Sequence, residues 1–182
     1  MKKTKLFLPA LALTIVAAAF LPRIITAQDD QGRILSESKE AKASFKKADP
    51  SMDQLFTKSA GYAIFPNVGK GAAGVGGAAG KGAVYEHGVP VGTAQMVQVT
   101  VGAQAGGQAY REIIFFENKA ALDRLMNNKF EFSGQASAIA VKSGASANAD
   151  YRDGVEVYSQ EKGGLMLEAS VGGQKFTYKK LK

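Results

Sequence analysis

The chain contains no cysteine among its 182 residues. No disulfide can therefore cross-link it, and no cysteine thioether can attach a lipid to it. Tryptophan is also absent, and His87 is the single histidine. The fold must therefore be held together by packing alone, and any contact with a membrane must be made by the folded surface.

The scarcity of histidine limits the catalytic chemistry that the chain can offer. A zinc site with several imidazole ligands is excluded, and a Ser-His-Asp triad would depend on His87 alone. The run Glu86-His87-Gly88 is typical of a hairpin turn, so we expect an exposed turn histidine. The acids at 29–30 and 150–153 lack calcium-loop spacing and are expected to be solvated. Two carboxylates that meet in space could still act as an acid and a base, but we predict a protein that is not an enzyme, with no catalytic, metal or cofactor site.

Long hydrophobic runs are also missing, with one exception at the N-terminus. A basic start, residues 1–5, precedes the apolar run 6–21, and Pro22 and Arg23 follow it, which is the layout of a secretory signal peptide. The apolar run is shorter than the roughly 20 residues that a membrane-spanning helix needs. We predict that residues 1–27 are a signal peptide cleaved after Ala27, with an uncleaved anchor as the alternative.

Removal of the predicted signal changes the size and the charge of the chain. The remainder is of the size of one domain, which we place at 33–182 behind a flexible N-terminus at 28–32. The signal contains four basic residues and no acid, so the formal net charge falls from +7 to +3. A charge of +3 without a dense Lys/Arg run excludes nucleic acid from the expected partners. We expect an exported protein, periplasmic or extracellular, with peripheral attachment to a membrane as one option.

Apolar spacing predicts three helices. In residues 33–48, the side chains of Ile34, Ala41, Phe45 and Ala48 fall on one side of a helix. Asp49-Pro50 ends that helix, and a second is expected at 51–58 with Ser51 as its cap. A third is expected at 118–128, where Asn118 is a good cap.

The remaining sequence predicts strands. Thirteen of the 21 glycines lie between residues 60 and 107, mixed with Ala and Val, so this segment is unsuited to helix and too apolar for a linker. We expect strands at 61–66, 82–86, 95–104, 111–116, 137–145, 155–160, 165–171 and 174–179, with turns at 153–154, 163–164 and 172–173. The fold class is therefore α+β: a mainly antiparallel β-sheet, sandwich or barrel-like, with N-terminal helices and one internal helix.

One nucleotide-binding pattern occurs within the glycine-rich segment. Residues 69–74 satisfy G-x-G-x-x-G, which in a dinucleotide fold lies between a strand and a helix. No helix-forming run follows, because residues 75–82 contain four glycines. We therefore interpret the match as a by-product of glycine content.

The same glycine-rich segment resembles a known family. The run SAGYAIFPNVGKG at 59–71, its continuation GVGGAAGKG at 74–82, GAQAGGQ at 102–108, and GGLM at 163–166 resemble the SYLF domain family in order and spacing. The resemblance covers about 33–182 and implies a lipid-binding module, related to eukaryotic domains that favour phosphoinositides and of which some bind actin. Those relatives usually carry a Gly-Trp-Ser motif, whereas this chain has GVPVGT at 88–93 and no tryptophan.

Two kinds of surface could bind lipid. The helix at 33–48 could lie on an anionic membrane with its lysines at head groups and Phe45 embedded, although packing on the sheet is the competing interpretation. Scattered basic residues could form a phosphate-binding patch or merely aid solubility. The candidate lipid-binding residues are Lys39, Lys42, Phe45, Lys46, Lys70, Lys81 and Arg111. The function we expect is binding of acidic phospholipid at the bacterial envelope; the alternative is a structural or protein-interaction module with an envelope protein as partner.

Overall fold

The computed structural model describes residues 27–73, 75–100, 108–132, 136–148, 150–162 and 169–181. Three helices are present in these ranges: α1 (Ala27–Ala48), α2 (Met52–Lys58) and α3 (Lys119–Met126). All three were predicted, and the expected cap of α3 is confirmed, since the Asn118 side chain accepts a hydrogen bond from the Ala121 N–H at 3.0 Å. Ser51 does not cap α2 through its side chain; its hydroxyl instead donates to Asp49.

The start of α1 differs from the prediction. The helix begins at Ala27 rather than at residue 33, so residues 28–32, which were expected to be flexible, are part of α1. Asp29 and Asp30 lie in the first turn, where negative charge is favourable at the positive end of the helix dipole. Asp30 also pairs with Arg33 one turn later and with Lys81 of the sheet, which fixes this turn against the rest of the molecule.

Eight strands form one sheet: β1 (Gly61–Ala73), β2 (Val75–Glu86), β3 (Val89–Thr100), β4 (Gln108–Phe116), β5 (Ser137–Ala140), β6 (Val155–Glu161), β7 (Ala169–Ser170) and β8 (Gln174–Lys180). Their order is β7-β5-β6-β4-β1-β2-β3-β8. Every pairing is antiparallel except that of β5 with β6. The predicted α+β class with a mainly antiparallel sheet is confirmed.

The sheet curls until its two ends meet. β7 and β8 stand at opposite ends of the strand order, yet only residues 171–173 separate them in the chain. The segments on either side of residues 133–135 contact both ends: the Phe132 N–H donates to the Gln174 carbonyl of β8 at 3.0 Å, and the Val171 N–H, just after β7, donates to the Ala136 carbonyl at 3.0 Å. The sheet is therefore barrel-like, which agrees with one of the two expected forms.

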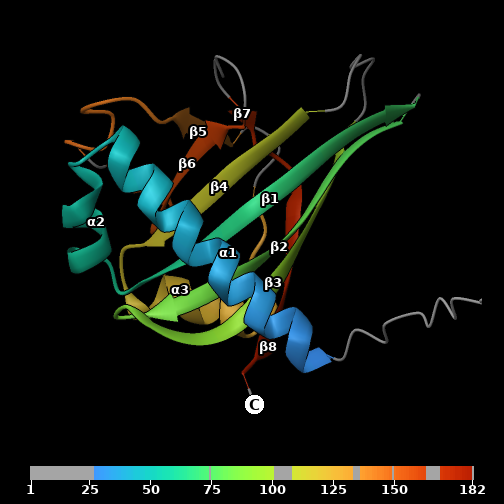
Figure 1. The fold of residues 1–182 in the computed structure, drawn as a ribbon, viewed down its shortest axis with the longest axis horizontal. Coiled ribbons are helices and arrows are strands. Elements are labelled where there is room, and N and C mark those ends of the chain that lie inside the picture. The colour runs from blue at the N-terminus through green and yellow to red at the C-terminus, as the bar shows by residue number, and fades with distance from the viewer. Residues whose placement is uncertain are drawn as a thin grey trace, which may run out of the picture.

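Each face of the sheet carries its own core. α1 and α2 cover the outer face, where Phe45 packs with Tyr62, Ile64 and Phe115, and α1 is seen crossing the strands in Figure 1. On the inner face, α3 packs beneath the sheet through residues such as Leu122. Side chains along β1 alternate between the two faces, and both faces are covered, so all of these side chains are buried. This explains why the sequence of β1 is a continuous apolar run rather than an alternation of apolar and polar residues.

The glycine-rich strands are longer than expected. β1 and β2 form a hairpin that extends well past α1 (Figure 1), whereas only 61–66 and 82–86 were predicted as strands. Gly82 allows the close approach: a Cβ there would lie 2.4 Å from the Ile64 carbonyl oxygen. The turn between β2 and β3 is confirmed, with His87 at φ 48° and Gly88 at φ 82°. The pattern G-x-G-x-x-G lies on β1 as far as Ala73, so it is not followed by a helix.

Several later elements differ in length from the prediction. β5 ends at Ala140 rather than at residue 145, because residues 143–148 form turns. On β3 the buried side carries Met96 and Gln98, while Val97 is 44% exposed. The turn at 172–173 and the one at 153–154 are present. The predicted turn at 163–164 and the predicted strand residues 101–104 and 165–168 lie outside the described residues.

Candidate functional site

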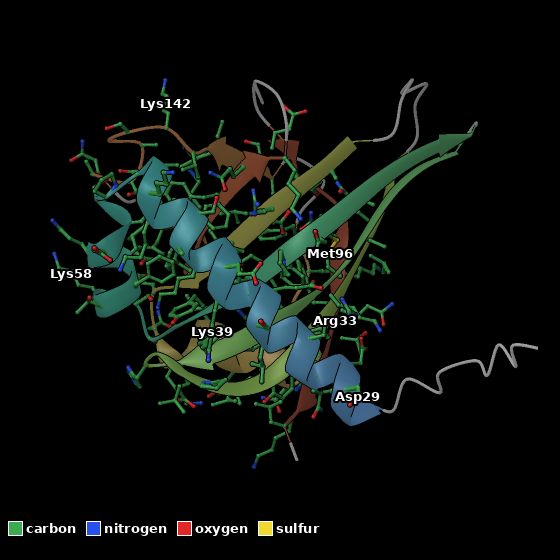
Figure 2. The ribbon with its side chains drawn as sticks, in the orientation of Figure 1. Asp29, Arg33, Lys39, Lys58, Met96 and Lys142 are labelled. Carbon is green, nitrogen blue, oxygen red and sulfur yellow. The ribbon has the colours of Figure 1, made fainter. Side chains whose placement is uncertain are left out.

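Three of the candidate lysines come together on one side of α1. Lys39, Lys42 and Lys46 are three and four residues apart, so they follow one side of the helix, which we call the lysine flank. The core-facing stripe of α1 separates them from Glu37 and Glu40, which follow the other side. Figure 2 shows Lys39 projecting from the middle of α1 and Lys58 from α2, while Lys142 lies at a different edge of the molecule.

The middle lysine of this flank is turned towards aromatic rings. The Lys42 ammonium donates to the Tyr62 hydroxyl at 2.7 Å and lies 4.3 Å from the centre of the Phe56 ring and 4.7 Å from that of Tyr62. Burial lowers the pKa of Lys42, and the positive charge of Lys46 lowers it further. Burial raises the pKa of Tyr62 to about 12, so this hydroxyl stays protonated at neutral pH. The ammonium group of Lys42 is therefore engaged within the protein, in cation–π contacts with aromatic rings, and is less available to an external anion.

The two outer lysines of the flank remain open to solvent. Lys46 pairs with Asp53 of α2 at 2.7 Å, but the two side chains are 41% and 59% exposed, and pairs open to solvent in this way are weak and easily exchanged. Lys39 is exposed and forms no ion pair within the described ranges. Both ammonium groups are therefore accessible to an anion that approaches α1 from this side.

The structure contradicts the prediction that Phe45 contacts a membrane. Its side chain has no exposed surface and packs in the core between α1 and the sheet. Burial follows from the stripe of α1, since Ile34, Ala41 and Phe45 all face the strands. The competing interpretation, packing of the helix on the sheet, is the one that the structure supports.

Lys81 lies apart from the lysine flank, near the N-terminal end of α1. Its ammonium is 2.7 Å from an Asp30 carboxylate oxygen. Hydrogen bonds from Lys81 and then Arg33 lower the pKa of Asp30, so the carboxylate is ionised and neutralises part of this positive charge. A cavity of 260 Å³ adjoins the pair and is also lined by Lys179 of β8. The backbone of Lys70 lies in β1 opposite Ala78 and Gln108, and its side chain is outside the described part.

Arg111 lies on the acidic side of α1, separated from the lysine flank by the helix. Its guanidinium is 3.4 Å from the Gln160 side-chain oxygen, which also accepts a hydrogen bond from Ser44 of α1 at 2.8 Å. Lys162 is its neighbour: burial lowers the pKa of Lys162 and the charge of Arg111 lowers it further. Lys162 was not predicted from the sequence, because it lies 51 positions from Arg111 and forms no local pattern with it; only the pairing of β4 with β6 brings the two together.

Catalytic, metal-binding and membrane-spanning features were also sought among the described residues. His87 is exposed in its turn, as predicted. In the part of the chain that the structure covers, no three His, Asp or Glu side chains are close enough to hold a metal ion. Of the helices described, none is long and apolar enough to cross a membrane.

Comparison with known proteins identifies relatives of this chain. Residues 97–180 match the model of the Ysc84 family, described as "Las17-binding protein actin regulator". The chain is also similar to beta cell expansion factor A of Aeromonas veronii, with 30% identity over 137 residues, which is 70% of this chain and 49% of the relative. The chain thus spans about half the length of that curated relative. The match over 97–180 includes the runs at 102–108 and 163–166, and the predicted resemblance of this chain to the SYLF (Ysc84) family is confirmed.

Proposed function

We propose that this protein binds acidic phospholipid at the surface of a bacterial envelope membrane, through the lysine flank of α1. Members of the SYLF family are generally binding modules rather than enzymes, and binding of lipid or actin is the activity associated with them. The observation that carries the proposal is the lysine flank itself: Lys39, Lys42 and Lys46 lie on one side of α1 with no acid of the helix among them, whereas the acids at 37 and 40 share the other side with Arg33 and Lys47.

The geometry favours contact with head groups rather than insertion of the helix. The apolar stripe of α1 is already used against the sheet, so no large apolar face of this helix remains for acyl chains. Lys39 and Lys46 are accessible, and each lysine near an anionic surface contributes about 1 kcal/mol of attraction. Binding should therefore be modest, reversible and weakened by salt.

Sedimentation with vesicles tests this proposal. The exported protein is mixed with vesicles of phosphatidylcholine alone or with added phosphatidylglycerol, over a series of salt concentrations. We expect binding to the anionic vesicles only, and loss of binding as salt rises. Equal binding to both vesicle types, or binding to neither, would contradict the proposal.

A pair of charge-matched variants locates the surface. The double variant Lys39→Glu/Lys46→Glu reverses the accessible lysines of the flank, while Lys129→Glu/Lys142→Glu makes the same change in net charge at exposed positions elsewhere. Only the first should abolish sedimentation. An equal loss in both would show that overall charge, and not the lysine flank, controls binding.

The alternative, a protein-interaction module, has one observation in its favour. Val89 is 62% exposed and Val97 44% exposed, and both lie on β3. Association through a free strand edge has less support, because β3 is already paired with β8. Crosslinking in intact envelopes tests the alternative: a partner lost on replacement of Val89 and Val97 by serine would favour it over lipid binding.

A further inference from the structure

The cavity of 260 Å³ beside Asp30 and Lys81 lies between the N-terminal end of α1 and the strands β2, β3 and β8. Figure 1 shows this end of α1 near β3 and β8. Most of the side chains around the cavity are polar or charged. They come from four elements: Asp30, Gln31 and Ile34 of α1, Lys81 of β2, Thr93 and Gln95 of β3, and Thr177 and Lys179 of β8.

The strand register places the strand residues of this set on one face of the sheet. Lys81 pairs with Gln95, and Gln95 pairs with Thr177, so these three side chains form one row across β2, β3 and β8. Thr93 pairs with Lys179 in the next row, two residues along each strand. Their chain neighbours in β3 and β8 point into the inner core, so both rows face outwards, towards α1 and the cavity.

Positive charge exceeds negative charge around the cavity. Lys81 and Arg33 both pair with the Asp30 carboxylate, at 2.7 Å and 2.5 Å, and Arg33 also pairs with Glu37 at 2.9 Å. Lys179 is exposed and forms no ion pair within the described ranges. Three cations therefore face two carboxylates, and an anion that enters the cavity meets an ammonium group that no acid has neutralised.

Uncharged donors lie between the two lysines of the cavity. Thr93 is 8% exposed, so its hydroxyl is largely shielded from bulk water, while Gln95 and Thr177 are open to solvent. Hydroxyl and amide groups commonly donate hydrogen bonds to phosphate oxygens, and lysine binds a phosphate as a flexible point charge. This combination of donors suits a phosphate group better than it suits a neutral or cationic molecule.

We propose that this cavity binds the phosphate group of a small phosphate ester. Lys81 and Lys179 supply positive charge from opposite corners of the two rows, and Thr93 and Gln95 donate hydrogen bonds between them. A free ester and a lipid head group share this chemistry, and the titrations below separate the two sources. The site uses other residues than the lysine flank, so it goes beyond the proposed membrane contact and does not depend on it.

Titrations followed by NMR test the proposal. The amide signals of Thr93, Thr177 and Lys179 are recorded while inorganic phosphate, glycerol 3-phosphate or glycerol is added to the exported protein at constant ionic strength. We expect saturable shifts with both phosphates and none with glycerol. Absence of a saturable shift with either phosphate, or equal shifts with glycerol, would overturn the proposal.

A short-chain lipid separates the two sources of the phosphate group. Dihexanoylphosphatidylglycerol, added below its micellar concentration, carries the glycerol phosphate as a diester. If it binds at least as tightly as glycerol 3-phosphate, the site is one for head groups; if it binds more weakly, the site is one for free esters. Both results support the phosphate site and identify its ligand.

Thr93 permits a test that preserves the shape of the cavity. Thr93→Val removes the hydroxyl at almost constant volume, and Thr93→Ser keeps it. Thr93→Val should weaken glycerol 3-phosphate at least about threefold, since a lost hydrogen bond costs this much or more, and Thr93→Ser should weaken it less than about twofold. Equal affinities of the two folded variants would contradict donation by Thr93.

Charge variants test the location by loss and by gain of affinity. Lys179→Met should weaken glycerol 3-phosphate at least about threefold, whereas Lys175→Met, the same change of charge on β8 outside the cavity, should have less than about a twofold effect. Asp30→Asn should strengthen binding, because it removes the carboxylate that competes for Lys81, and a misfolded protein cannot produce such a gain. Equal effects of the two lysine variants, or weaker binding in folded Asp30→Asn, would overturn the assignment to this cavity.

The flank variant separates this site from the proposed membrane contact. Lys39→Glu/Lys46→Glu should lose sedimentation with anionic vesicles but bind glycerol 3-phosphate within about twofold of the unaltered protein at physiological salt. Loss of glycerol 3-phosphate binding in this variant would show that the phosphate is bound at the lysine flank and not in the cavity.

Discussion

Asp49 and Ser146, which are 97 residues apart, form a two-point contact in the interior. The Asp49 carboxylate accepts hydrogen bonds from the Ser146 N–H and from the Ser146 hydroxyl, each at 2.8 Å. It also accepts from the Gly144 N–H at 3.0 Å and from Ser51. One buried carboxylate therefore joins the end of α1 to the turn that follows β5.

Replacement of this carboxylate should destabilise the protein. Asp49→Asn keeps the size of the side chain but replaces one accepting oxygen by an amide N–H₂, which faces the N–H and hydroxyl donors of the neighbouring residues. We therefore expect the free energy of unfolding to fall by about 2–3 kcal/mol. Denaturant unfolding at pH 7 measures it. Asp53→Asn is the control, because it removes only an exposed ion pair and should cost less than about 1 kcal/mol. Equal losses in both variants would contradict this role of Asp49.

The same group predicts a dependence of stability on acid. Burial opposes ionisation of Asp49, but the hydrogen bonds from Ser51, Ser146 and Gly144 outweigh it and lower the pKa to about 2. Because the pKa is lower in the folded than in the unfolded state, the stabilisation is present above about pH 4 and is lost as the pH falls towards 2; it amounts to about 2 kcal/mol. Asp49→Asn should flatten the stability curve across this window, as followed by unfolding at a series of pH values. A curve of unchanged slope would show that other acids control the transition.

Two glycines of the long hairpin should respond in opposite ways to alanine. At Gly82 a Cβ would lie 2.4 Å from the Ile64 carbonyl oxygen and 2.8 Å from the Phe65 ring, so Gly82→Ala should cost about 1–3 kcal/mol. At Gly69 nothing lies within 4 Å of the added carbon, so Gly69→Ala should leave stability unchanged or raise it slightly. Melting temperatures of the two variants compare them directly. Similar melting temperatures would mean that β2 can move away from β1 at little cost.

Lys42 should contribute less to lipid binding than its exposed neighbour. Lys42→Met keeps a long side chain on the Phe56 and Tyr62 rings and removes a partly buried charge, so stability should change by less than about 1 kcal/mol. Sedimentation with anionic vesicles should fall more for Lys39→Met than for Lys42→Met. The reverse order would indicate that Lys42 leaves the rings when the protein meets a membrane.

The mass of the protein recovered after export shows whether the predicted signal peptide is cleaved. When the full chain is produced in a bacterial host with an export pathway, we expect a mature species that begins at Gln28, measured by intact mass and N-terminal sequencing. Replacing Ala27 by a bulky residue such as Phe should slow the cut or shift it. Recovery of an intact chain that begins at Met1 would favour the uncleaved anchor.

Features that depend on neighbours in sequence could be predicted. The stripe of Ile34, Ala41 and Phe45 predicted α1, with its packing on the sheet as one of two interpretations. Asn118 predicted the start of α3, and His87-Gly88 predicted a turn, because each signal lies within a few residues. The family resemblance was likewise available from the glycine-rich runs.

Features set by distant contacts could not be predicted. A strand was predicted at 95–104, but not that Met96 and Gln98 of β3 would lie inside; Gln98 is tolerated there because its amide donates to the Gly172 carbonyl at 2.9 Å. The partners of Lys42 and Arg111 come from other elements, so the basic residues that seemed equivalent in sequence separate into three places. The length of the glycine-rich strands was missed because glycine and alanine leave no polar-apolar alternation to read.

The pairing of β3 with β8 has a consequence for how the chain reaches this structure. Met96 pairs with Phe176, 80 residues later, and the register runs as far as Gly92 with Lys180. While the chain is still being made, β3 has an open edge, and the inner core lacks Phe176. Folding that depends on contacts between such distant segments is slow, so β3 keeps an unpaired edge until the late-synthesised β8 docks against it.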